Sequence, residues 1–267
     1  MSEREDLSTG SGHDAVGLGP WQQLAPGVWC AVAEPDTVNL VLVAGTERAL
    51  LVDTGSSPEQ GRAVRAAVAD VCPVPLEVVV VTHDHHDHVR GLPAFDDLTT
   101  LAHEDVPGTN RPIALAAAFD LGGRRVEVAH LGRGHTGADL VVVVPDADLV
   151  VVGDLVESAA PPSLGPDSFL QEWPVTLDGV IGLMTGATRA VPGHGDPVDR
   201  PYVYEQRGRL AAVAGQVRQL AESGVGAADA LAREEEWAYP LATLAPGLEV
   251  AFAQLGPVAV RRPLPLA

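Results

Sequence analysis

The chain has 267 residues, which is enough for one large domain with a sizeable hydrophobic core. Its formal net charge is −19, and all 17 basic residues are arginine. So acidic a surface repels phosphate backbones and anionic headgroups, which argues against nucleic acids and membranes as partners and favours a small-molecule substrate.

The N-terminal 18 residues are rich in serine, glycine and acidic side chains, so we expect a flexible tail at 1–18. Residues 19–267 would form a single domain, with helices at its C-terminal end from about residue 200. The longest apolar stretches run about 6–8 residues, whereas roughly 20 are needed to cross a bilayer. The charged N-terminus lacks a secretory pattern, and two cysteines make no disulfide framework. A cytoplasmic protein is therefore expected.

Hydrophobic patterning predicts alternating strands and helices along the rest of the chain. Strands are expected near 28–33, 38–44, 48–52, 76–82, 98–102, 125–129, 139–144, 148–153 and 189–192. Helices are expected near 58–70, 175–186, 200–223 and 226–237. Ser57 can cap the first of these helices, and Pro58 suits its first turn. This mixture predicts two sheets packed face to face with helices outside.

A dense run of ligand-type residues follows the strand near 76–82. It has the form His-x-His-x-Asp-His, made by His83, His85, Asp87 and His88. Imidazole nitrogens and carboxylate oxygens are ordinary zinc ligands. Alternate side chains of an extended segment point the same way, so His83 and His85 can share one ion. The chain must then turn, so Asp87 and His88 can face a second ion. Taken alone, the run could also be a polar loop that contains histidines by chance.

Three later segments repeat one pattern, in which an apolar strand is followed by glycine and a ligand-type residue. They end at His135 within Gly134–Gly137, at Asp154 after Gly153, and at His194 between two glycines. Small neighbours let the backbone approach a buried ion closely. The pattern predicts that several strand ends deliver side chains to one edge of a sheet.

Together these segments resemble the metallo-β-lactamase superfamily of binuclear metal hydrolases. Five motifs occur in that family's order: Asp53 within Leu51–Gly55, the His83 to His88 cluster, His135, Asp154 and His194. The resemblance covers roughly residues 26 to 200, and its specificity lies in the five motifs together rather than in any one. It implies an α/β fold, the four-layer αββα sandwich.

The resemblance also implies a ligand set for two divalent ions. One ion would be held by His83, His85 and His135, the other by Asp87, His88 and His194, with Asp154 bridging them. Asp53 would accept a hydrogen bond that orients a ligand histidine, although Asp-Thr-Gly is also common at plain strand-to-loop turns. Zinc is the expected metal, while iron and manganese accept the same ligands.

Two such ions, roughly 3.5–4 Å apart, would share a hydroxide and polarise the scissile group, with Asp87 orienting the hydroxide. The expected function is hydrolysis of a small ester-like substrate: a thioester, a lactone or an amide. Asp154 stands where one β-lactam-cleaving subgroup carries cysteine, and another subgroup lacks the bridging aspartate. The chain therefore looks more like glyoxalase II and the lactonases.

Several alternatives stay open beside this hydrolase. An iron-dependent sulfur dioxygenase shares much of the motif set, and β-lactam hydrolysis could be a main or side activity. A metal-stabilised binding protein without activity is disfavoured by the complete ligand set. Arg133 and Glu157 flank ligand segments and are candidate pocket residues. The stretch 158–174, rich in proline and glycine, could form a pocket wall or a plain surface crossover.

Overall fold

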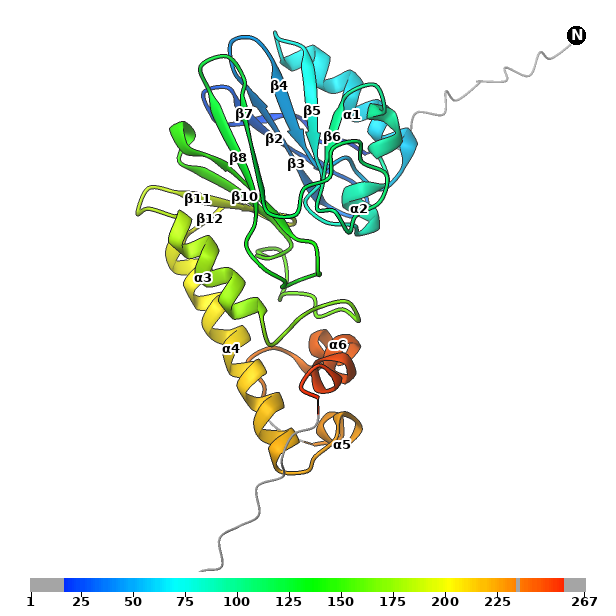
Figure 1. Cartoon of the computed structure of the whole chain (residues 1–267), viewed down its shortest axis with the longest axis vertical. Helices are drawn as coiled ribbons and strands as arrows, with labels where there is room; N and C mark the ends of the chain where they lie inside the picture. The colour runs from blue at the N-terminus through cyan, green and yellow to red at the C-terminus, as the bar shows by residue number, and fades with distance from the viewer. Residues whose placement is uncertain (1–16, 234–235, 257–267) are drawn as a thin grey trace, which may run out of the picture.

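The computed structural model describes residues 17–233 and 236–256. Two six-stranded sheets pack face to face, and helices cover both outer faces (Figure 1). The predicted αββα sandwich is therefore confirmed. Of the tail predicted for 1–18, only Gly17 and Leu18 lie within the described residues, and Leu18 forms a bridge with Ala33.

The first sheet has the strand order β1-β2-β3-β4-β5-β6. Its strands are β1 (Gln22–Ala25), β2 (Val28–Ala33), β3 (Val38–Ala44), β4 (Ala49–Val52), β5 (Leu76–Val80) and β6 (Thr99–Leu101). Helix α1 (Pro58–Val71) connects β4 to β5, which run parallel. Ser57 caps α1 as predicted, because its hydroxyl accepts a hydrogen bond from the backbone N–H of Gln60 at 3.1 Å.

The second sheet has the order β12-β11-β10-β9-β8-β7. Its strands are β7 (Ala116–Asp120), β8 (Arg125–His130), β9 (Leu140–Val144), β10 (Leu149–Gly153), β11 (Arg189–Pro192) and β12 (Val198–Asp199). β10 and β11 run parallel, joined through helix α3 (Trp173–Leu183). The short helices α2 (His86–Val89), η1 (Leu92–Phe95) and η2 (Pro145–Ala147) complete the sandwich.

Successive side chains along a strand point to opposite faces of the sheet, and this divides the hydrophobic core into layers. In β3, Val41 and Val43 join the apolar cluster between the sheets, whereas Leu40 and Leu42 join the cluster under α1. Val142 of β9 enters the space between the sheets from the other side. Both sheets are covered on both faces, which explains why their central strands are continuous runs of valine and leucine.

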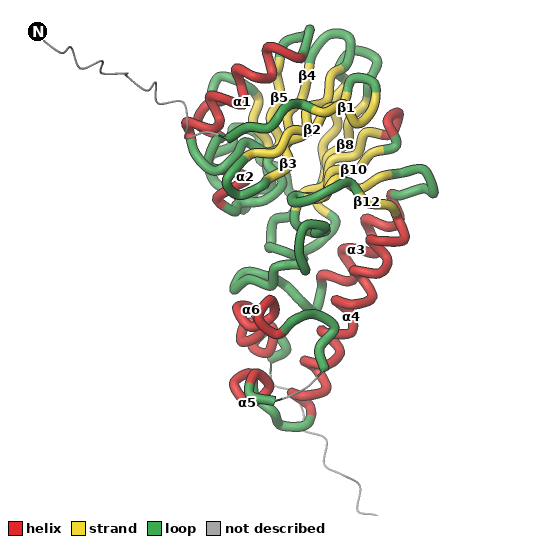
Figure 2. The backbone as a smooth tube through the Cα atoms, turned by 180° about the vertical axis from the view of Figure 1, so that it is seen from behind, coloured by secondary structure: helices red, strands yellow, loops and turns green. Residues whose placement is uncertain are grey.

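The C-terminal helices extend beyond the sandwich. Helix α4 (Arg200–Glu222) runs along α3 and past the sheets, and α5 (Ala227–Leu231) and α6 (Leu241–Ala253) lie beside its far part (Figure 2). No helix in the described part of the chain has both the length and the apolar character that crossing a bilayer requires.

Several parts of the secondary structure differ from the prediction, and strands β1 and β12 and helix α6 were not predicted. The helix expected over 226–237 is too long: α5 covers only Ala227–Leu231 of it, and residues 234–235 lie outside the described residues. The segment before α6 instead packs on α4, where the Arg209 guanidinium lies over the Tyr239 ring at 4.1 Å and donates to the Ala238 carbonyl. Strand β7 was missed because alanine-rich sequence carries little strand signal; its pairing with β8 makes it a strand.

Candidate metal centre

Parallel pairing brings the predicted ligand loops to one edge of the sandwich. β4 and β5 end on the same side of the first sheet, so Asp53 and His83 leave it together. β10 and β11 do the same in the second sheet for Asp154 and His194. The buried Asn39 joins the two edges, because its amide donates to the carbonyl oxygens of Pro192 and Gly195 at 3.0 and 2.7 Å.

The predicted ligands fall into two adjoining groups. We call the first compartment His83, His85 and His135, and the second compartment Asp87, His88 and His194. In the first compartment, one ligand atom from each histidine and one carboxylate oxygen of Asp154 all lie within 4.8 Å of one another. In the second compartment, one ligand atom from each of the three residues also lies within 4.8 Å of the others. Asp154 faces both, with Oδ1 3.2 Å from His88 Nε2 and Oδ2 3.4 Å from His135 Nε2.

These residues fit a divalent metal. Nε2 of His83, Nε2 of His88 and Oδ1 of Asp154 are buried, and none has a hydrogen-bond partner among the described residues. Each unsatisfied buried polar atom costs about 1–3 kcal/mol. A cation accepts lone pairs from all three atoms at once, and imidazole and carboxylate are the donors that zinc, iron and manganese share.

In the first compartment, His83 and His135 are neutral imidazoles, whereas for His85 the effect of burial is outweighed by Asp167, which raises its pKa. Burial lowers the pKa of His83 well below its usual value and lowers the pKa of His135 to about 4. Neighbouring histidines lower the His83 value further. Both rings therefore offer a lone pair at neutral pH with no proton to remove.

The second compartment behaves in the opposite way. Burial acts to lower the pKa of His88, but the carboxylates of Asp154 and Asp53 outweigh it and raise that pKa well above its usual value. For His194, burial is likewise outweighed by Asp154 and Asp87, which raise its pKa to about 10. Protons thus occupy these two rings until a metal displaces them.

Asp53 lies directly behind His88. Its Oδ2 is 2.8 Å from His88 Nδ1, and its Oδ1 accepts from the backbone N–H of Thr82 at 2.7 Å. Asp53 has φ 64°, a left-handed conformation that aspartate tolerates better than most residues. A proton held on Nδ1 leaves Nε2 free to face the second compartment, which is the arrangement predicted for Asp53.

Comparison with known proteins points to one family. A family model described as the Metallo-beta-lactamase superfamily matches residues 33–104, which include Asp53 and the ligands from His83 to His88. The chain is 30% identical over 135 residues to a metallo-beta-lactamase type 2 of Bacillus cereus, covering 46% of this chain and 53% of that protein. In sequence over this region and in fold, the chain is similar to the metallo-β-lactamase superfamily.

Solved structures of the superfamily share the fold. The chain is similar to a metallo-beta-lactamase from Pontibacter korlensis, with a TM-score of 0.64 and 23% identity over 72% of this chain and 98% of that chain. A metallo-beta-lactamase from Erythrobacter litoralis gives a TM-score of 0.62 at 21% identity, and the match covers 72% of this chain and 95% of that chain. The matched region spans about half the length of the Bacillus relatives.

Two residues that sequence analysis missed contact the predicted ligand histidines from outside the two groups. Asp167 Oδ2 lies 2.8 Å from His85 Nε2, and the Ser168 hydroxyl donates to the His135 carbonyl at 2.7 Å. Both come from the irregular segment between β10 and α3. Proline and glycine mark that segment as a loop, but no spacing within it signals a contact with the ligand histidines.

Three further histidines near the ligand segments, and the candidate pocket residue Arg133, have ordinary contacts. His86 is exposed and faces Asp36 at 3.6 Å. The rings of His103 and His130 contact each other in a tilted arrangement, with their centroids 4.5 Å apart. Arg133 pairs with Glu172 and lies over the Phe169 ring at 4.2 Å. None of these side chains belongs to either ligand group in the described residues.

Glu157 lies closer to the centre than its sequence position suggests. Its side chain is buried, and one carboxylate oxygen lies within 4.8 Å of ligand atoms of Asp154 and His194. Burial, followed by the charge of Asp154, raises the pKa of Glu157 to about 9. Glu157 is therefore a fourth acidic group at the metal centre beside Asp53, Asp87 and Asp154.

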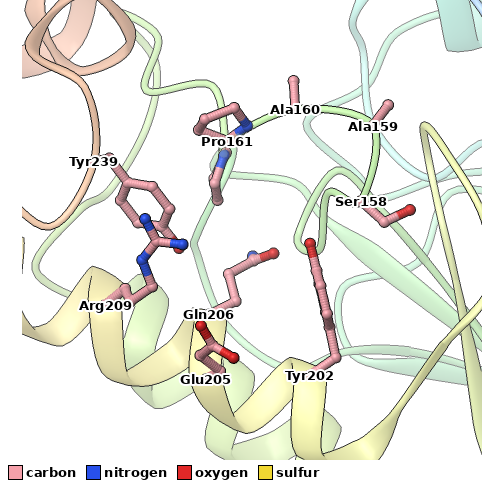
Figure 3. Close-up of a pocket in the computed structure, with 10 residues that line it drawn as sticks. Ser158, Ala159, Ala160, Pro161, Tyr202, Glu205, Gln206, Arg209 and Tyr239 are labelled. Atoms are coloured by element: carbon pink, nitrogen blue, oxygen red, sulfur yellow. The ribbon is translucent and has the colours of Figure 1, made fainter.

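A pocket of about 250 Å³ opens between the loop that begins at Ser158 and helix α4 (Figure 3). Ser158, Ala160, Tyr202, Gln206 and Tyr239 are among its lining residues. The first part of the 158–174 segment thus forms a pocket wall, while Asp167 and Ser168 rest on the ligand histidines.

Proposed function

We propose that this protein is a metal-dependent hydrolase that cleaves a small ester-like substrate, namely a thioester, a lactone or an amide. The observation that carries the proposal is the convergence of unpartnered buried atoms, Nε2 of His83, Nε2 of His88 and Oδ1 of Asp154, between two ligand groups. Similarity to the metallo-β-lactamase superfamily supports it. His83, His85 and His135 would hold one ion, Asp87, His88 and His194 a second, and Asp154 both.

When bound, divalent ions supply an acidified water and a Lewis acid for the scissile group, and zinc is the ion we expect. The protein's own residues orient the reactants. Asp87 Oδ2 lies 3.3 Å from His194 Nε2 in the second compartment. In the proposed mechanism this carboxylate would accept a hydrogen bond from the attacking water. Asp53 keeps the proton of His88 on Nδ1. No serine or cysteine nucleophile is needed.

The substrate would reach the centre from the side of His85 and His194. Their side chains are 31% and 16% exposed, whereas those of His83 and His88 are 1% and 0% exposed. The buried pair can act only as ligands, while the exposed edge leaves room for a substrate carbonyl.

β-Lactam hydrolysis is the second candidate, because the Bacillus relatives are named metallo-beta-lactamases. Asp154 weighs against it, since the resembling β-lactam-cleaving subgroups carry cysteine at that position or lack the bridging aspartate. A sulfur dioxygenase would need one redox-active iron, and the ligand-type residues of the second compartment favour a two-metal hydrolase instead.

Metal content and a substrate panel test the proposal together. Protein purified without added metal would be analysed by mass spectrometry and assayed with thioesters, lactones, amides and a chromogenic β-lactam. We expect close to two ions per chain and turnover of a thioester, lactone or amide. Turnover of the β-lactam alone would support the second candidate. About one iron per chain, a silent panel and oxygen uptake with a persulfide would overturn the hydrolase.

A further inference from the structure

Glu157 is a buried carboxyl group that the proposed hydrolase mechanism does not use. Only 6% of the residue is exposed, so its carboxyl group has left bulk water. Among the described residues, no hydrogen bond or ion pair within normal distance joins that carboxyl group to a cation. Burying an acid beside Asp154 without a compensating partner is unfavourable.

The backbone of Glu157 is fixed from helix α4. Gln206 Oε1 accepts from the Glu157 N–H at 3.1 Å, and the Tyr202 hydroxyl donates to the Glu157 carbonyl at 2.8 Å. The Gln206 amide also donates to the Leu155 carbonyl at 2.9 Å. Figure 3 shows Tyr202 and Gln206 rising from α4 toward the loop. These contacts hold the Glu157 side chain against the metal centre rather than in solvent.

Glu157 makes the two compartments chemically different. The first contains three imidazoles and shares Asp154. The second contains two imidazoles and Asp87, shares Asp154, and has Glu157 within 4.8 Å of both Asp154 and His194. The unpartnered Nε2 of His88 and Oδ1 of Asp154 belong to this side. Imidazole-rich sites suit zinc, whereas carboxylate-rich sites suit harder ions such as manganese.

We propose that Glu157 is a further carboxylate ligand of the second compartment, and that this compartment prefers a harder ion, such as Mn²⁺ or Fe²⁺, while the first prefers Zn²⁺. The inference rests on the proposed metal centre. It makes this protein a mixed-metal enzyme, with the harder ion on the side of His194 and Glu157.

Manganese binding measured by electron paramagnetic resonance tests the assignment, since free and bound Mn²⁺ give different spectra. Full-length protein freed of metal would receive one equivalent of Zn²⁺ and then be titrated with MnCl₂. We expect the wild type to bind one Mn²⁺, and Glu157→Gln to bind it at least about tenfold more weakly. Zinc retained per chain, measured by mass spectrometry, should be the same in both proteins.

Two variants separate ligation from the presence of a carboxyl group and from folding. Glu157→Asp keeps the carboxyl group but shortens the side chain, so a ligand role predicts weak Mn²⁺ binding in this variant too. Glu249→Gln makes the same chemical change on the exposed surface of α6 and should bind like the wild type. Circular dichroism melting checks that each variant is folded.

The outcomes distinguish this inference from the proposed function. Equal Mn²⁺ affinity in wild type and Glu157→Gln, or wild-type affinity in Glu157→Asp, would overturn the ligand assignment and leave the hydrolase intact. Loss of zinc along with manganese in Glu157→Gln would also overturn it, since the effect would not be confined to one compartment. A wild type that binds neither ion would overturn both proposals.

Discussion

Asp167 Oδ2 lies 2.8 Å from His85 Nε2, although the two residues are 82 positions apart. The other nitrogen of that ring, Nδ1, lies 2.8 Å from His135 Nε2 inside the first compartment. A carboxylate that accepts from Nε2–H fixes the proton there and leaves the Nδ1 lone pair for a metal. Asp167 therefore does for the first compartment what Asp53 does for the second.

Replacing Asp167 by alanine should weaken metal binding without unfolding the protein. The carboxylate is 46% exposed, so its loss leaves no buried charge, but His85 loses its fixed orientation. We expect the affinity of the first compartment for Zn²⁺ to fall by about 10–100-fold, measured by competition with a chelating dye. Asp167→Asn, which keeps an oxygen acceptor, should recover part of the affinity. Asp178→Ala, an exposed acid paired with Arg207, is the matched control. Equal affinity in all four proteins would show that Asp167 does not position the ligand.

Asp53→Ala should be far more destabilising. Asp53 is 1% exposed and accepts hydrogen bonds from the Thr82 N–H and hydroxyl and from His88. Removing it leaves a buried imidazole and a buried N–H without their partner, which costs about 3–5 kcal/mol. Urea unfolding of the metal-free protein would measure the loss. The exposed acid Asp97, paired with Arg65 at the surface, supplies a control whose replacement by alanine should change stability little. A loss no larger than that of the control would mean that Asp53 is only a turn residue.

Asp154→Ala should remove the group that faces both compartments. We expect the second ion to bind weakly and turnover to fall by orders of magnitude, while the circular dichroism spectrum stays that of the wild type. Metal per chain by mass spectrometry is the direct measurement. Asp84→Ala changes an exposed acid inside the same ligand run and should keep full metal content. Normal content and activity in Asp154→Ala would rule out the two-metal centre.

Metal binding should release protons, mainly from the second compartment. The pKa of His194 is raised to about 10 and that of His88 is well above its usual value, so both rings are protonated at neutral pH. His83 and His135, with lowered pKa values, have none to lose. Because a metal must displace these protons, affinity at the second compartment should fall as pH falls through neutrality. Calorimetry in buffers of different ionisation enthalpy should count at least two protons per chain on full loading, from His88 and His194, and a further one if Glu157, with its pKa raised to about 9, becomes a ligand. Release of none would show that His88 and His194 carry no displaceable proton before the metal binds.

Local spacing predicted the parts of the centre that depend on neighbouring residues. His83, His85, Asp87 and His88 sit within one short run, and strand geometry already divides them between two sides. For His135, Asp154 and His194, each of which follows a strand and a glycine, the rule that parallel strands end at the same edge was enough to predict that they lie close together. The structure brings all of these side chains together, because β4 pairs with β5 and β10 with β11.

Tertiary structure alone decided the outer contacts. Asp167 and Ser168 reach His85 and His135 from a loop with no periodic pattern, so nothing local in the sequence fixes its path. Glu157 became part of the centre only because Gln206 and Tyr202, from a helix almost 50 residues later, hold its backbone (separations of 49 and 45 positions). The amino-acid sequence by itself determined the fold class and the identity of the candidate ligands, since both follow from short-range patterns of polarity. Which carboxylates support those ligands, and how the two compartments differ, depended on long-range packing between loops and helices, which no short-range pattern encodes.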